Sequence, residues 1–95
     1  MDDLDLARRL RILYRTVQML QSDLRQGHLN SKLLADIEMR MEHGIATEPR
    51  CAGLSAPVDA LRESTLTPRA ELFADTIRSC EKLNDAIEGV LSDIA

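Results

Sequence analysis

The chain is poor in aromatic residues, cysteine, glycine and proline. Tyr14 and Phe73 are its only aromatic residues, although 44% of its 95 residues are hydrophobic. Leucine, isoleucine, valine, methionine and alanine must therefore fill the core, which suits helices better than sheets. No alternation of polar and apolar residues predicts a β-strand. We expect an all-α fold in a single domain over residues 1–95.

Long apolar runs and chemically reactive cysteine pairs are also missing. No segment approaches the roughly 18 apolar residues of a membrane span, and no signal-like stretch precedes the chain. Cys51 and Cys80 lack the CxxC or Cys/His neighbours that metal or redox chemistry uses. We expect Cys80 in the core, Cys51 in a loop, a cytoplasmic location that keeps both thiols reduced, and no membrane partner.

Catalytic and cofactor motifs are absent as well. The sequence has no GxSxG, no phosphate-binding glycine loop and no HExxH, and His28 and His43 stand fifteen residues apart without a second ligand at metal-binding spacing. The carboxylates fall at positions that helices expose to solvent, so none has a sequence reason for a shifted pKa. We expect no enzyme activity, no cofactor and no metal.

The first half of the chain predicts a helical hairpin. Its strongest pattern predicts a helix over residues 4–26, started by Asp2, Asp3 or Asp5 as a cap and ended by Gly27. The apolar positions of this helix, spaced four and three apart, are Leu6, Leu10, Leu13, Val17, Leu20 and Leu24. A second helix is predicted over 31–43, with Asn30 or Ser31 as its cap, and the short connection favours antiparallel packing.

The second half predicts a loop followed by two helices. Residues 44–56 carry Gly44, Pro49 and Gly53 and predict a loop, and a short helix over 57–64 is expected with Ser55 as its cap. Thr67 and Pro68 form a start signal for a last helix over 68–92. We therefore predict a small antiparallel helical bundle of three long helices plus this short fourth helix.

The net charge of −4 is unevenly distributed along the chain. Residues 8–25 hold five arginines and one aspartate, a local charge of +4. Arg8, Arg11 and Arg15 are three and four residues apart and share one helix face, roughly opposite the leucines. This face is either a docking strip for an acidic partner or a solvated face balanced by acids of neighbouring helices.

Three further residues stand out in the predicted helices. Ile12 and Met19 lie on the same outward side as the arginines, where they predict an interface or, alternatively, scattered exposed apolar residues. Asn84 falls among the apolar positions of the last helix. There it either fixes register or oligomeric state as a buried side chain, or lies at the edge of the apolar stripe in contact with water.

These features favour a small helical protein–protein interaction module. We expect a regulator, antagonist or chaperone-like adaptor that covers a partner surface, or a homodimer, with Arg8, Arg11, Ile12, Arg15 and Met19 as partner-binding residues. The alternative is nucleic-acid binding through the arginine face, which the acidic remainder and the lack of an aromatic stacking platform oppose.

A small helical-bundle enzyme is the third reading. The chain resembles the small helical chorismate mutases in size, helix content and an arginine-bearing first helix. The resemblance implies arginines that point into a pocket between helices, whereas Arg8, Arg11 and Arg15 are predicted to point away from the leucines. No catalytic residue is carried over.

Overall fold

A computed structural model describes residues 2–66 and 73–94 of the chain. The described residues form four α-helices and no strand, which confirms the all-α fold. The helices are α1 (Asp3–Arg25), α2 (Ser31–Arg40), α3 (Ser55–Ser64) and α4 (Phe73–Ile94), and two shorter helical turns, η1 (Met41–Ile45) and η2 (Pro49–Leu54), lie between α2 and α3.

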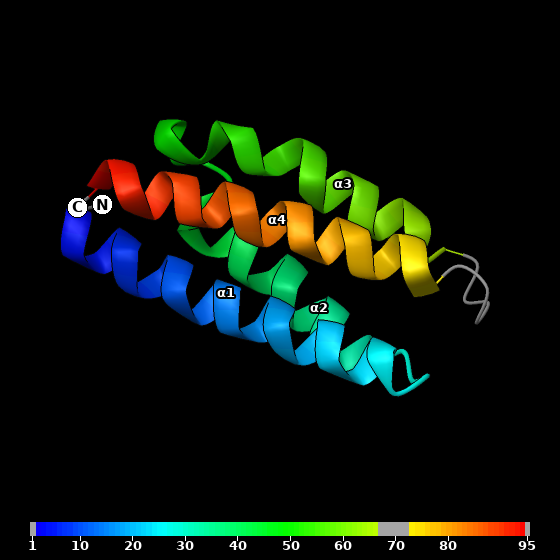
Figure 1. The fold of residues 1–95 in the computed structure, drawn as a ribbon. Coiled ribbons are helices and arrows are strands. Elements are labelled where there is room, and N and C mark those ends of the chain that lie inside the picture. The colour runs from blue at the N-terminus through cyan, green and yellow to red at the C-terminus, as the bar shows by residue number, and fades with distance from the viewer. Residues whose placement is uncertain (1, 67–72, 95) are drawn as a thin grey trace.

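The helices form a small antiparallel bundle. α1 and α4 run side by side in opposite directions, α2 packs on α1 and α3 packs on α4 (Figure 1). The bundle measures 40 × 19 × 19 Å, and both ends of the chain lie at the same end of it. The predicted architecture is confirmed with one correction. Only α1 and α4 are long, because α2 and α3 have ten residues each.

The leucine positions of α1 form the centre of the core. All the apolar positions that predicted this helix are buried, and α4 contributes Cys80, Leu83 and Ile87 from the opposite side. Each fully buried leucine or isoleucine side chain stabilises the fold by about 1.5–3 kcal/mol relative to an exposed one. The inner half of α1 is therefore committed to holding the bundle together.

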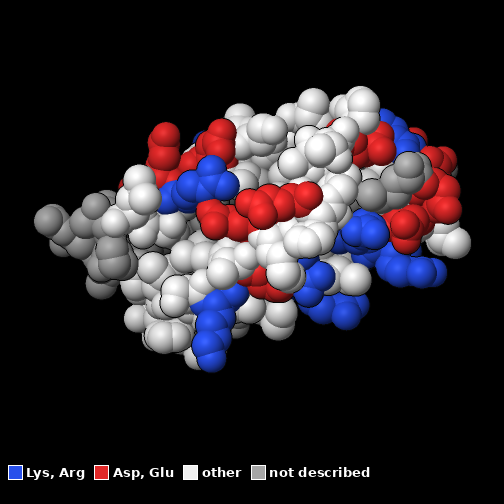
Figure 2. All heavy atoms as spheres, turned by 180° about the vertical axis from the view of Figure 1, so that it is seen from behind, with Lys and Arg blue, Asp and Glu red and all other residues white. Residues whose placement is uncertain are grey.

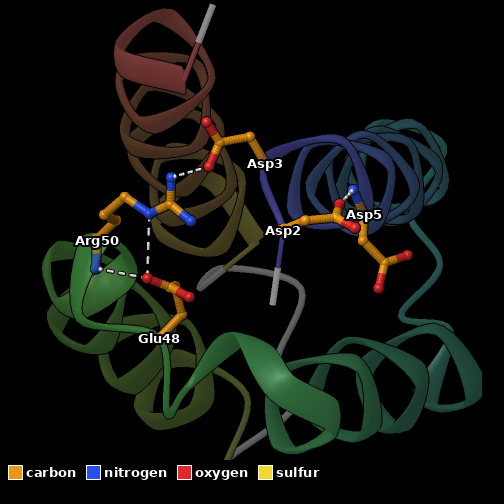
Figure 3. Close-up of polar contacts among 5 residues, drawn as sticks. All are labelled: Asp2, Asp3, Asp5, Glu48 and Arg50. Carbon is orange, nitrogen blue, oxygen red and sulfur yellow. Dashed lines mark hydrogen bonds and ion pairs between the residues drawn. The ribbon is translucent and has the colours of Figure 1, made fainter.

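Local side chains set the helix ends that the sequence predicts. Asp2 accepts a hydrogen bond from the Asp5 backbone N–H at 2.7 Å and so caps α1 (Figure 3). Gly27 follows α1 with a φ of 84°, a conformation that disfavours residues with a side chain. At α2 the cap is Asn30, whose side chain accepts from the backbone N–H groups of Lys32 and Leu33.

α2 ends earlier than predicted. The expected end at residue 43 is wrong. After Arg40 the helix widens into the π-helical turn η1, where the Ala46 N–H donates to the Met41 carbonyl at 2.7 Å. His43 leaves the helical conformation, and Gly44 takes a φ of 96°. Glycine stops this helix, as the sequence indicates, but the wide turn begins three residues before it.

The prediction of a loop over residues 44–56 is wrong for its second half. Pro49 opens η2 at a position where the missing N–H costs no hydrogen bond. Cys51, expected in a loop, and Leu54 are instead buried in the core. α3 then begins at Ser55, so this residue lies inside the helix and does not cap it.

Arg50 ties this segment to the start of α1. Its guanidinium donates to Asp3 and to Glu48, as Figure 3 shows. The hydrogen bond from Arg50 lowers the pKa of Glu48, and the bond to Asp3 is the largest cause that raises the pKa of Arg50. The contact of Arg50 with Asp3 therefore links η2 to the first turn of α1.

α4 runs to Ile94 and passes Gly89 without a break, two residues beyond the predicted end. The predicted start of this helix at Thr67 and Pro68 lies outside the described residues.

Candidate protein-interaction surface

The five residues predicted to bind a partner share one exposed surface of α1. Arg8, Arg11 and Arg15 are exposed, and the exposed fractions of Ile12 and Met19 are 38% and 47%. At about 100° per residue, all five lie on the side of α1 that faces away from its buried leucines. We call these five residues the α1 outer face.

The three arginines of the α1 outer face have no acidic partner among the described residues. Every other described arginine forms an ion pair with a carboxylate at 3.8 Å or less: Arg9, Arg25, Arg40, Arg50, Arg62 and Arg78. Residues 8–22 themselves contain no Asp or Glu. One interpretation of the sequence expected acids of neighbouring helices to balance this face. No ion pair between the described residues does so.

The molecule seen from behind the view of Figure 1 carries charges of both signs (Figure 2). On the face seen in Figure 2, acidic side chains form a band across the middle, with basic side chains on either side of it. Ion pairs of the other arginines join residues of one helix or of two helices, such as Arg40 with Asp36 at 3.0 Å and Arg62 with Glu38 at 2.7 Å. Among the described arginines, those without an ion pair therefore all lie in α1.

A groove of about 230 Å³ borders the α1 outer face on its α2 side. The groove is lined by Arg9, Ile12, Met39, Arg40, His43 and Ile45. Ile45 is buried, whereas Met39 is 45% exposed, so the groove has an apolar floor and an accessible apolar wall. Arg9 donates to the His43 carbonyl at 2.7 Å and so links the two sides of the groove.

Met39 is a surface residue that the sequence analysis missed. The apolar periodicity of α2 pointed to Leu34, Ile37 and Met41, and Met39 falls outside that stripe. An apolar residue off the buried stripe is the same signal that identified Ile12 and Met19. Its position beside Ile12 depends on how α1 and α2 pack, which periodicity does not give.

A second groove, of about 410 Å³, lies on the α4 side of α1. Arg11, Arg15 and Tyr14 line it together with Glu88 of α4. The Tyr14 hydroxyl donates to Glu88 Oε1 at 2.6 Å, and this hydrogen bond is the main cause that raises the pKa of Tyr14. Glu88 is therefore engaged by the phenol and forms no ion pair with either arginine.

A third groove, of about 380 Å³, separates α2 from α3. Its apolar lining includes Ile37, Val58 and Leu61, but its charged rim residues, Arg62 and Glu38, already bind each other. The 410 Å³ groove differs from this one because its arginines, Arg11 and Arg15, form no ion pair with a described residue. The arginines of the 230 Å³ groove, Arg9 and Arg40, are paired with Asp5 and Asp36.

Asn84 lies inside the bundle rather than at a wet edge. It is 7% exposed, and its Oδ1 has no hydrogen-bond partner among the residues that the structure describes. It stands midway between two links from α4 to α1, Tyr14 to Glu88 and Gln21 to Glu81. That Asn84 fixes the register of the α1–α4 contact stays a prediction. Because Asn84 is buried within one chain, its side chain is unavailable for contact with a second copy.

The cysteines are poorly suited to nucleophilic chemistry. Burial raises the pKa of the Cys80 thiol to about 12 and also raises that of Cys51. In residues 2–66 and 73–94, no group of three His, Cys, Asp or Glu side chains is placed to hold a metal ion. None of the helices in that part of the chain has the length and hydropathy of a membrane span.

Comparison with protein-family models finds no match, and comparisons with curated proteins and with solved structures find none either. The functional argument therefore depends on the geometry of this molecule.

Replacement of Asn84 by leucine tests the cost of its buried oxygen. An unsatisfied buried acceptor destabilises a fold by about 1–3 kcal/mol, and the larger leucine offsets part of the gain by crowding. We expect Asn84→Leu to raise the free energy of unfolding by about 1 kcal/mol in urea denaturation. Asn84→Ala is the control, because it removes the amide but leaves a cavity. A leucine variant less stable than the wild type would contradict this expectation.

Tyr14 gives a direct test of the α1–α4 contact, since it is the only tyrosine and the chain has no tryptophan. Its raised pKa means that the folded state holds the phenolic proton more tightly than the unfolded state. The resulting stabilisation is present below the unfolded-state pKa and is lost as pH rises through the folded-state pKa.

We expect phenolate absorbance in a pH titration to show a midpoint above the ordinary value of about 10. Glu88→Gln should lower this midpoint, because the charge that opposes the phenolate is gone. Identical midpoints in the two proteins would argue against the contact, and circular dichroism checks that both remain folded.

Proposed function

We propose that this chain is a small helical protein–protein interaction module that docks a partner on the α1 outer face. One observation carries the proposal: the described arginines without acidic partners share a helix face with the exposed side chains of Ile12 and Met19. Arginine and methionine are enriched in protein interfaces, and apolar contacts surrounded by polar groups supply most of the binding energy.

The fold suits a docking surface of this kind. The outer face belongs to a helix whose other side is locked into the core by its leucines, so the binding residues are held on a rigid element. A preorganised surface loses little conformational entropy on binding. A regulator, antagonist or adaptor that covers a partner's surface would use such a face. Two free thiols fit the reducing cytoplasm in which we expect it to act.

Charge favours a different protein over a second copy of this chain as the partner. A two-fold dimer places the same patch of both subunits in contact. Through the α1 outer face it would bring Arg8, Arg11 and Arg15 of each copy together, with no acid from residues 8–22 between them. Like charges in contact at an interface cost several kcal/mol. The exposed Ile12 and Met19 favour a protein over nucleic acid, whose phosphates are bound by charged and polar groups.

The test is affinity capture from cells that express the protein, with the wild type and an Ile12→Glu/Met19→Glu variant. We expect the variant to keep its helical circular dichroism, because both side chains are substantially exposed, and to lose the captured protein. Leu66→Glu is the control, since Leu66 is exposed and lies at the groove between α2 and α3. A partner retained by the double variant but lost from the control would place the binding site elsewhere.

Light scattering of the same proteins tests the homodimer. A wild-type mass of twice the chain mass, reduced to one chain in the double variant, would show a second copy on the α1 outer face. We expect the mass of a single chain for both proteins.

A further inference from the structure

We infer that the segment docking here is an acidic amphipathic helix, which lies along α1 and places one large apolar side chain in the groove beside Ile12. The inference rests on the proposed function and specifies the chemistry of the partner. It follows from the charge of the α1 outer face, the size of the groove and the spacing of the residues.

The charge of the surface selects an acidic partner. Arg8 and Arg15 are exposed and form no ion pair with any described residue, and residues 8–22 supply no carboxylate. Two acids of the neighbouring helices that lie near α1 are engaged, Asp36 with Arg40 and Glu88 with Tyr14. Carboxylates from a partner would therefore meet free guanidinium groups, with which they can form paired hydrogen bonds.

The groove has the size of a side-chain anchor. Its volume of about 230 Å³ is below the roughly 300–1,000 Å³ typical of small-molecule sites. Buried Ile45 forms its floor, and the exposed atoms of Ile12 and Met39 form its walls. A methionine side chain adapts its shape to what it contacts. One leucine-sized or aromatic side chain from the partner fits these dimensions and this lining.

The spacing along α1 matches a helix. Ile12 and Met19 are seven residues apart, as are Arg8 and Arg15, which corresponds to about 10 Å along the helix axis. A partner helix aligned with α1 presents apolar and acidic residues at the same seven-residue period. An extended strand returns to the same face about every 7 Å and does not keep this register. Helix-in-groove recognition uses apolar anchors at this kind of spacing.

The probe is a synthetic helix of three heptads. It carries leucine at a and d, glutamate at e and g, alanine or glutamine elsewhere, and a terminal fluorophore. A matched peptide has lysine in place of every glutamate, so both have the same apolar face and both repel themselves. Fluorescence anisotropy measures binding to the full chain. We expect the glutamate peptide to bind at least about tenfold more tightly than the lysine peptide, with an affinity that falls as salt is added.

Two pairs of variants locate the site. Arg8→Gln/Arg15→Gln should weaken binding of the glutamate peptide by about five- to tenfold, the expected loss of two exposed charge pairs. The charge-matched control, Arg78→Gln/Lys82→Gln on the exposed side of α4, should change it by less than about twofold. Ile12→Ser/Met39→Ser should remove detectable binding, while Leu66→Ser should leave it unchanged. Circular dichroism confirms that each variant is folded.

Several results would overturn the inference. One is equal binding of the glutamate and lysine peptides. Another is an equal loss of binding in Arg8→Gln/Arg15→Gln and in Arg78→Gln/Lys82→Gln. The third is no peptide binding together with binding to phosphatidylserine vesicles that depends on Arg8 and Arg15. Failure of the proposed function looks different. If cellular capture depends on Ile12 and Met19 but no acidic peptide binds, only the acidic helix is wrong. If capture is also independent of these residues, both proposals fail.

Discussion

Burial of the α1 leucines against α2 and α4 is the constraint on which the rest of the structure depends. Both neighbouring helices meet the same half of α1, because its buried apolar positions occupy one half of its circumference. The other half is left to solvent. Stability and proposed binding are therefore divided between two faces of one helix, and changes to the outer face should leave the core intact.

The α1 outer face stays basic in an acidic protein because residues 8–22 contain no acid and two nearby acids of α4 have other partners. Glu81 accepts from Gln21 and pairs with Arg25, and Glu88 accepts from Tyr14. Arg11 and Arg15 line the groove beside Glu88 and form no ion pair with a described carboxylate. The local field of the face is thus positive although the net charge is −4, and at physiological salt a partner senses the field within about 8 Å.

The sequence predicted those features that depend on neighbouring residues. α1, an aspartate cap at its start and the exposure of Arg8, Arg11 and Arg15 follow from local periodicity and capping chemistry. The choice of Asp2 over Asp3 and Asp5 as the cap comes from the structure. The loop prediction is wrong because proline and glycine, here Pro49 and Gly53, are typical of loops but do not exclude a helix. A spacing of three, four and three through Cys51, Leu54, Val58 and Leu61 begins just after Pro49 and continues past Gly53, and all four residues are buried. The groove at Met39 and the missing partners of Arg8 and Asn84 depend on how helices pack, which periodicity does not give.

The most direct test of the account is methionine oxidation by dilute peroxide, followed by mass spectrometry of the isolated chain. Oxidation rate follows side-chain exposure. Met19 and Met39 are 47% and 45% exposed, whereas Met41 is 6% exposed. We predict that Met19 and Met39 oxidise at least about tenfold faster than Met41 at every protein concentration. Protection of Met19 equal to that of Met41 would contradict the account, because it would show that the α1 outer face is already covered.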